Sequence, residues 1–240
     1  MRIALRGVLF DATGTLVELR EPVGETYARI AARHGVCLPA WRIEDAFARV
    51  LRSAPARVFP GASLAEAARR ERAAWREIVR ATFRAADQTA RFAAQRAHDS
   101  FDACFDALWE HYARPGAWCA REGAEAALDE LTRRGLVLGV VSNFDQRLPD
   151  VLAGLGLAGR LCAIVLPAHA GAAKPDPRIF AHALAALGLA ARDAVYVGDD
   201  PEHDFQGARA AGLRALDVRR LASLRELPDR IAEGALPSGA

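Results

Sequence analysis

The stretch Gly7-Val8-Leu9-Phe10-Asp11-Ala12-Thr13-Gly14-Thr15-Leu16 decides how this chain folds. Residues 7–10 form a short apolar run, which is typical of a strand buried in a parallel sheet. An aspartate follows directly, so its carboxylate is expected at the strand end, where it could act as a nucleophile or a metal ligand. Gly14 permits the sharp turn that brings a backbone close to a phosphate. The structural alternative is an Asp11 that only caps the next turn.

Further apolar runs with the same character lie later in the chain, at residues 136–141, 162–166 and 194–197, and residues 213–218 are expected to form a fifth strand. Helical segments separate them, and several of these segments end at a glycine, as helix C-termini commonly do. This alternation predicts an α/β fold with a parallel sheet. Ligands of such sheets bind beyond the carboxyl ends of the strands, so polar residues at those ends are expected to share one crevice.

Residues 17–118 differ from the rest because they show helical periodicity and no strand pattern. Aromatic residues at helical spacing form two stripes there, which we interpret as helix-packing faces and not as cofactor sites. The stripes are Trp75, Ile78, Val79 and Phe83, and Phe101, Phe105, Leu108, Trp109 and Tyr112. We therefore expect a discontinuous core of residues 1–16 and 119–240, interrupted by an α-helical cap over residues 17–118.

The overall composition excludes several classes of function. The 240 residues carry 32 basic and 30 acidic side chains, mixed along the chain, for a formal net charge of +2. That balance leaves no basic surface for nucleic acid, and no apolar run is long enough to cross a membrane. The four cysteines have no metal-ligand spacing. We expect a cytoplasmic protein with reduced thiols, which is either a monomer or a homodimer.

Two more strand ends carry polar groups. Ser142 and Asn143 follow the run at 136–141, where a hydroxyl and backbone N–H groups can hold phosphoryl oxygens. Their structural alternative is an ordinary helix N-cap. Asp199, Asp200 and Asp204 follow the run at 194–197, and clustered carboxylates of this kind favour Mg²⁺. An acidic helix N-terminus, stabilised by the helix dipole, is the alternative there.

Lys174 is the only lysine among the 32 basic residues of the chain. Arginine fills every other basic position, although it cannot replace lysine where a compact ammonium must fit among buried oxygens. The position therefore predicts a buried cation that neutralises a nucleophile and a phosphate. A chance survivor of an arginine-rich composition is the alternative.

Taken together, these motifs and their order resemble the haloacid dehalogenase superfamily over nearly the whole chain. The helical insertion resembles the first-class cap of that superfamily, and the remainder its Rossmann-like core. Several runs resemble, more narrowly, the type represented by haloacid dehalogenase-like hydrolase domain-containing protein 3. Those runs are residues 22–25, 142–145, 154–157 and 174–180.

The resemblance implies a Mg²⁺-dependent phosphatase that acts on a small phosphorylated metabolite. Asp11 would attack phosphorus to form an aspartyl-phosphate, and Lys174 would be the second catalytic residue. The implied substrate-binding residues are Ser142, Asn143 and Thr15. The implied metal ligands are Asp11, the backbone carbonyl of Thr13, Asp199 and Asp204, the last mostly through water.

One position departs from the pattern of the family. Its phosphatases usually carry a second aspartate two residues after the nucleophile, as general acid and base, and this chain has Thr13 there. General acid–base catalysis typically contributes ~10²–10⁴-fold to the rate. We therefore expect ready phosphorylation of Asp11 by activated donors and slow hydrolysis of the intermediate. A weakly active or non-catalytic phosphate-binding module is the alternative.

A 2-haloacid dehalogenase is a lower-ranked alternative. Those enzymes also lack the second aspartate, and they receive the halide on an arginine of the cap. The spacing along the chain from Asp11 to Trp41 and Arg42 is similar to the spacing from the nucleophile to that arginine in the dehalogenases. However, dehalogenases need no metal and lack the carboxylate cluster at 199–204. Three carboxylates around a substrate carboxylate would repel it without a cation, so phosphate chemistry is favoured.

Overall fold

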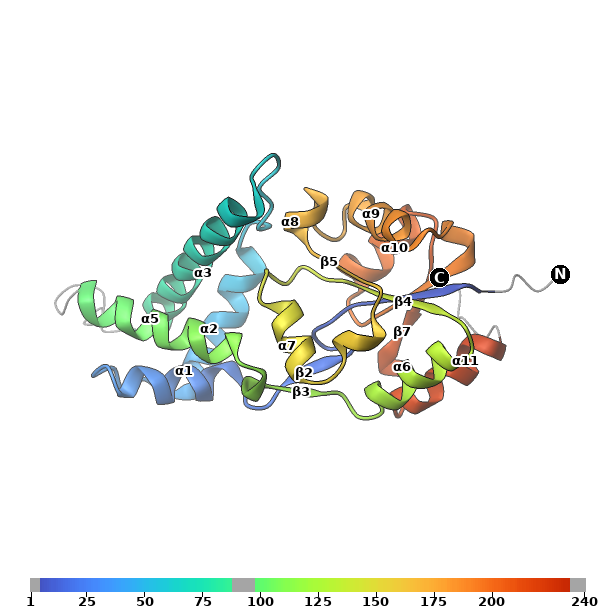
Figure 1. Cartoon of the computed structure of the whole chain (residues 1–240). Helices are drawn as coiled ribbons and strands as arrows, with labels where there is room; N and C mark the ends of the chain where they lie inside the picture. The colour runs from blue at the N-terminus through green and yellow to red at the C-terminus, as the bar shows by residue number, and fades with distance from the viewer. Residues whose placement is uncertain (1–4, 88–97, 234–240) are drawn as a thin grey trace.

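The computed structural model describes residues 5–87 and 98–233, and it confirms the α/β fold (Figure 1). The central sheet has five parallel strands in the order β5-β4-β1-β6-β7. The strands are β1 (Gly7–Phe10), β4 (Val137–Val141), β5 (Ala163–Val165), β6 (Ala194–Gly198) and β7 (Arg214–Asp217). Each forms where the sequence predicted a strand, because every such stretch is long enough to cross the sheet once.

Strand β1 lies in the middle of the sheet, and its register aligns the strand ends. Phe10 lies opposite Val140 on β4 and opposite Val197 on β6. The polar residues that follow these three strands therefore emerge at one edge of the sheet, as expected for parallel strands.

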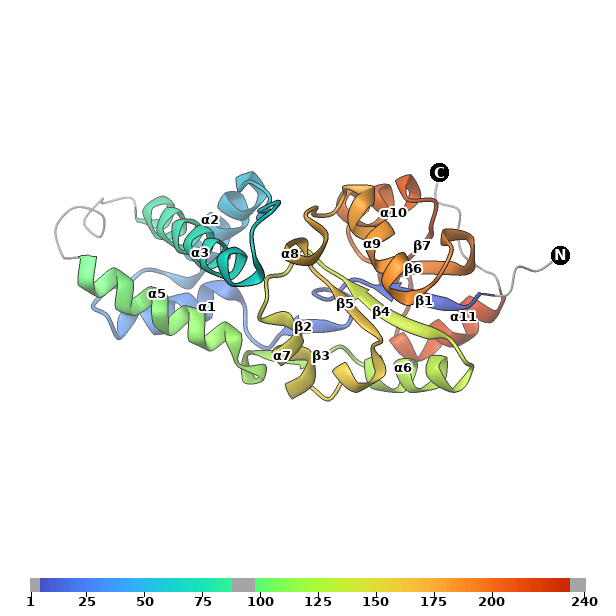
Figure 2. The same ribbon diagram turned by 45° about the horizontal axis from the view of Figure 1, so that its top comes forward.

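Helices cover both faces of the sheet (Figures 1 and 2). Val8 and Phe10 of β1 belong to one hydrophobic cluster, whereas Leu9 between them belongs to another. The first cluster includes residues of α6 (Ala124–Arg133), α7 (Leu148–Gly154) and α11 (Leu227–Glu233). The second includes residues of α9 (Pro177–Leu187) and α10 (Gly207–Ala210). This two-sided burial explains why β1, β4 and β6 are almost entirely apolar and do not alternate.

A short antiparallel ribbon departs from the sequence-based expectation. Strand β2 (Val17–Leu19) pairs with β3 (Trp118–Ala120), although residues 17–118 had shown no strand pattern. Three residues are too few to display a period of two, so pattern reasoning could not find these strands. The ribbon joins the chain segments that leave and re-enter the sheet domain.

The segment between β2 and β3 is helical in its described part. It holds α1 (Val23–Ala32), α2 (Ala40–Ser53), α3 (Leu64–Ala86) and α5 (His98–Ala113), which lie together beside the sheet domain (Figure 1). These helices pack around a hydrophobic cluster of their own. Tyr27 is at its centre, with ring centroids of Phe47, Phe83 and Tyr112 within 5.7–6.1 Å.

The shorter elements connect these parts. They are η1 (Pro115–Ala117), η2 (Ala158–Arg160), α8 (Pro167–Ala170), η3 (Ala191–Asp193), η4 (Pro201–Gln206), η5 (Val218–Arg220) and η6 (Leu224–Glu226). After β6 the chain first forms the π-helical turn η4, at whose start Asp200 accepts hydrogen bonds from the N–H groups of Glu202 and His203. Across residues 5–87 and 98–233, no helix combines the length and apolarity needed to cross a bilayer.

We predict that Gly24→Ala destabilises the protein, because α1 and α2 approach each other closely at this residue. A Cβ at position 24 would lie 2.2 Å from the carbonyl oxygen of Ala40. Relief of such overpacking should lower the free energy of unfolding by about 1–3 kcal/mol in urea titrations. Gly159→Ala is the matched control, since no atom lies within 4 Å of a Cβ there. Equal stability of the two variants would contradict this packing.

Candidate active site

A buried ammonium group lies at the carboxyl edge of the sheet. Lys174 Nζ donates to Asp11 Oδ1 at 2.6 Å, to Asp204 Oδ1 at 2.6 Å and to the Tyr196 hydroxyl at 3.0 Å. Only 4% of the side chain is exposed. Three oxygens therefore match the three protons of the ammonium group. A planar guanidinium is too large for this arrangement, which gives a physical reason for a lysine here.

Asp204 uses both carboxylate oxygens in hydrogen bonds. Oδ1 accepts from Lys174 and lies 2.9 Å from the hydroxyl of Tyr196, whereas Oδ2 accepts from the backbone N–H groups of Asp199 and Asp200 at 2.9 and 3.0 Å. Gly198 makes this close approach possible, because a Cβ there would lie 2.3 Å from Oδ2. Asp204 thus connects the loop after β6 to the lysine.

Tyr196 is a site residue that the sequence analysis missed. It lies on β6, fully buried, and its hydroxyl is 3.1 Å from the carbonyl oxygen of Val141 as well as close to Lys174. Burial and the neighbouring Asp11 and Asp204 raise its pKa well above the usual value, so the phenol stays neutral. A tyrosine inside an otherwise apolar strand was the available signal, since a buried hydroxyl usually has a partner.

Three carboxylates converge close to the lysine. One oxygen each of Asp11, Asp199 and Asp204 lie within 4.8 Å of one another. Burial raises the pKa of Asp11 to about 6, with Lys174 opposing the rise and Asp204 adding to it. Burial and Asp204 also raise the pKa of Asp199. Hard oxygen donors whose charges repel one another fit a divalent cation such as Mg²⁺.

The residues around Asp199 fit the same role. The Thr15 hydroxyl donates to Asp199 Oδ1 at 3.3 Å. Gly14 has a φ of 86°, and a Cβ there would lie 2.7 Å from Asp199 Oδ2. Because both oxygens of Asp204 are occupied, Asp11 and Asp199 are the carboxylates with room to bind a cation directly.

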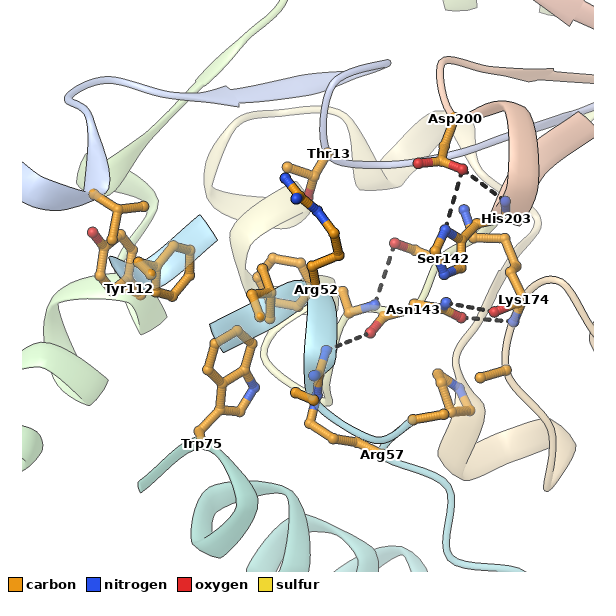
Figure 3. Close-up of a pocket in the computed structure, with 18 of the residues that line it drawn as sticks. Thr13, Arg52, Arg57, Trp75, Tyr112, Ser142, Asn143, Lys174, Asp200 and His203 are labelled. Carbon is orange, nitrogen blue, oxygen red and sulfur yellow. Dashed lines mark hydrogen bonds and ion pairs between the residues drawn. The ribbon is translucent and has the colours of Figure 1, made fainter. Parts of the chain in front are cut away.

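Ser142 and Asn143 follow β4 at the same edge. Ser142 is buried, and its hydroxyl accepts a weak hydrogen bond from the N–H of Phe144 at 3.4 Å. The Asn143 side chain holds the backbone of Lys174: Oδ1 accepts from its N–H at 2.7 Å and Nδ2 donates to its carbonyl at 2.8 Å (Figure 3). Both polar atoms of the Asn143 amide are thus engaged with the lysine.

A cavity of 720 Å³ opens from these residues toward the helical segment. Asp11, Ser142 and Lys174 line its sheet end, and Thr13 is exposed at its wall. The two aromatic stripes do more than pack helices, because some of their members line the other end. Those members are Trp75, Val79, Phe105, Leu108, Trp109 and Tyr112.

Contacts between the loop after β4 and the helical segment bound the cavity. The backbone and side-chain N–H groups of Gln146 both donate to Glu71 of α3 at 3.3 Å. Arg147 is bound by Asp145 and donates to the carbonyl of Trp109 on α5 at 3.3 Å. The loop that carries Ser142 is therefore fixed from both sides.

The cavity brings together most of the residues singled out from the sequence. Its lining includes Asp11, Thr13, Ser142, Asn143, Lys174, Asp199 and Asp204. Thr15 contacts Asp199 and is not part of the lining. Trp41 and Arg42 are also absent from the lining, and Trp41 is 67% exposed. Arg52 and Arg57 do line the cavity, and nothing in the sequence had distinguished them from the other arginines.

We predict that Asp204→Asn is far more damaging than Asp200→Asn. An amide accepts on one side only, so at position 204 its NH₂ would face either Lys174 or two backbone N–H groups. Urea titrations should show a loss of about 3–5 kcal/mol in the free energy of unfolding, as for a broken buried ion pair. Asp200 accepts through Oδ1 alone, so Asp200→Asn should cost within about 0.5 kcal/mol. Similar small losses in both would show that Asp204 is not held on both sides.

Comparison with known proteins places this geometry in context. Residues 5–212 match the haloacid dehalogenase-like hydrolase family. The chain is 37% identical over 217 residues to haloacid dehalogenase-like hydrolase domain-containing protein 3 of Mus musculus, covering 90% of this chain and 83% of that protein. It is 45% identical over 101 residues to a phosphoserine phosphatase of Thermus thermophilus, covering 40% and 39%.

Among solved structures, the fold is similar to that of a HAD phosphatase from Thermococcus onnurineus. The TM-score is 0.60 at 21% identity, with 96% of this chain and 98% of that chain covered. At that identity the likeness concerns the fold alone. The relative from Mus musculus confirms the narrower resemblance seen in the sequence runs. With a family match over most of its length and a 37% identical relative, the chain belongs to the haloacid dehalogenase-like hydrolase family.

Proposed function

We propose that this hydrolase is a Mg²⁺-dependent phosphatase that acts on a small phosphorylated molecule through an aspartyl-phosphate at Asp11. The observation that carries the proposal is the 2.6 Å contact between Lys174 and Asp11 at the sheet end of a large cavity. A buried cation on one carboxylate oxygen keeps Asp11 ionised and leaves the other oxygen for attack. The phosphoserine phosphatase among the similar proteins supports this class of reaction.

Phosphoryl transfer to Asp11 is the first step of the proposed mechanism. Oδ1 stays bound to Lys174 while Oδ2 attacks phosphorus, and the bond from phosphorus to the leaving oxygen breaks. The Ser142 hydroxyl and the Lys174 ammonium stabilise the negative charge on the phosphoryl oxygens. Asp204 and Tyr196 act indirectly, by holding the ammonium in position.

The proposed metal site consists of Asp11, Asp199 and the backbone carbonyl of Thr13. When bound there, Mg²⁺ supplies charge neutralisation and orients the phosphoryl group in line with the attacking oxygen. The hydrogen bonds on Asp204 support an indirect role for this residue, in line with its expected contact through water.

Water attack on the aspartyl-phosphate completes the cycle, and this step is the slow one in our proposal. Thr13 occupies the position two residues after the nucleophile, where phosphatases of the family usually carry their general acid and base. A threonine hydroxyl titrates far above neutral pH, so it cannot perform that proton transfer efficiently. The same observation supports the second candidate, a weakly active phosphate-binding module. The absence of Arg42 from the cavity lining makes dehalogenase chemistry the less favoured alternative.

We place the activity in the cytoplasm, which the four unpaired cysteines support.

We predict that Thr13→Asp raises the turnover of simple phosphate esters by about 10²–10⁴-fold, the typical contribution of general acid–base catalysis. Release of inorganic phosphate should be measured with Mg²⁺ and after its removal by a chelator. Activity of both proteins should disappear with the metal. Thr13→Asn is the matched control, since it has the size of aspartate at the same position but no proton to transfer, and it should not gain activity. Fast wild-type turnover that Thr13→Asp does not increase would contradict a missing acid.

A further inference from the structure

The cavity is larger than a phosphoryl group requires. Its volume of 720 Å³ falls within the ~300–1,000 Å³ of pockets that enclose a drug-sized ligand. The phosphoryl site occupies only the sheet end, next to Lys174. The leaving group of the substrate must occupy the end formed by the helical segment, so the walls of that end report its chemistry.

The far end of the cavity is aromatic. Its lining includes Tyr27, Phe47, Trp75, Phe105, Trp109 and Tyr112. The rings contact one another, as in the pairs Tyr27–Tyr112 and Phe105–Trp109, whose centroids are 6.1 and 6.0 Å apart. Aromatic walls favour a flat apolar ligand, which gains edge-to-face or offset stacking contacts.

Two buried N–H donors in the cavity wall have no acceptor among the described residues. They are Nε of Arg57 and Nε1 of Trp75. The side chains stack, with the guanidinium carbon 4.6 Å from the indole centroid. Because buried donors in proteins nearly always have a partner, two such groups beside one cavity indicate a ligand that brings acceptor oxygens.

Arg57 also forms no ion pair within the described part of the chain. Its guanidinium donates a 3.3 Å hydrogen bond to the carbonyl of Asn143. Asp145 and Glu71 act on it through space without contacting it: Asp145 is paired with Arg147, and Glu71 accepts hydrogen bonds from the amides of Gln146. Burial lowers the pKa of Arg57, which shows that the guanidinium is poorly solvated. A desolvated cation without an ion pair favours an anionic ligand group.

A second arginine faces the same space. Arg52, in the last turn of α2, lines the cavity and forms no ion pair or hydrogen bond with the described residues. Figure 3 shows both arginines between the aromatic side chains and the phosphoryl end of the cavity. Asp199, Asp200 and Glu202 line the phosphoryl end and would repel a second anion there. A second negative group on the substrate is therefore directed to the arginines.

Thr13 adds a constraint on the leaving oxygen. Without a general acid, a leaving group departs readily only if it is a weak base, as a phenolate is and an alkoxide is not. We propose that the substrate is an aryl phosphate monoester that carries a carboxylate, with its ring in the aromatic end of the cavity and its carboxylate on Arg57, assisted by Arg52. This inference rests on the phosphatase activity proposed above.

The reaction balances without a further co-reactant. The bond between Asp11 Oδ2 and phosphorus forms as the bond between phosphorus and the aryl oxygen breaks. The aryl oxygen leaves with the electron pair as a phenolate, which takes a proton from water. A water molecule then attacks the phosphoryl group, and inorganic phosphate and free Asp11 result.

Binding of phosphonates tests the inference independently of turnover. Phenylphosphonate and its ortho, meta and para carboxy derivatives would be titrated in Mg²⁺ against the fluorescence of the cavity tryptophans. At least one carboxy isomer should bind wild type about 10- to 100-fold more tightly than phenylphosphonate, the factor expected for a hydrogen bond to a charged group. Arg57→Met should remove that preference. Arg84→Met, an exposed arginine on α3 outside the cavity lining, should retain it.

The outcomes separate this inference from the proposed function. Equal affinities for all the phosphonates in wild type, or a preference that survives in Arg57→Met, would overturn the inference. The wild-type comparison needs no variant, so it decides even if Arg57→Met does not fold. Turnover of small esters without a carboxylate preference would sink the substrate class alone. A carboxylate preference in binding with no turnover of any ester would instead sink the phosphatase and leave the binding site standing.

Discussion

The contact of one buried lysine with two aspartates determines how this site is built. Lys174 comes from the loop before α9, Asp11 from the end of β1 and Asp204 from η4, so a single ammonium joins three separate segments. Breaking a buried pair of this kind typically costs ~3–5 kcal/mol, because a charge is left unpaired. The surrounding groups complete the arrangement: Tyr196 satisfies the third proton and Asn143 fixes the backbone of the lysine.

The arrangement places opposite charges in different parts of one cavity. Carboxylates gather at the sheet end, where their raised pKa values reflect burial and mutual repulsion. The guanidinium groups of Arg52 and Arg57, which form no ion pair with the described residues, lie toward the helical segment, and aromatic rings close the far end. From the sheet end outward, the cavity walls are therefore complementary first to a cation, then to a phosphoryl group, then to a second anion and finally to a flat apolar group. The contacts of Glu71 and Arg147 keep the two halves of the cavity together.

The sequence was sufficient for the sheet and for the convergence of its polar ends, because apolar runs mark strands and parallel strands end at one edge. It could not show the β2–β3 ribbon, whose strands are too short to have a period. Tyr196 was missed because its hydroxyl meets Val141 of β4 and Lys174, just before α9, only in the folded protein. Arg57 was missed because the absence of an ion pair depends on its burial and its neighbours in the fold. In the sequence, nothing separates it from the 31 other basic residues. The hydrogen bonds that occupy both oxygens of Asp204 likewise depend on the turn η4, which no sequence motif indicates.

The identity of the phosphoryl acceptor is the central claim, and mass spectrometry of the acid-quenched protein tests it most directly. Wild type would be mixed with acetyl phosphate and Mg²⁺, quenched within the first turnover and digested. We expect one phosphoryl group on the peptide that contains Asp11, and none in Asp11→Asn. Hydrolysis of phosphate esters with no phosphorylated peptide at any time, or with the phosphoryl group on another residue, would contradict the account.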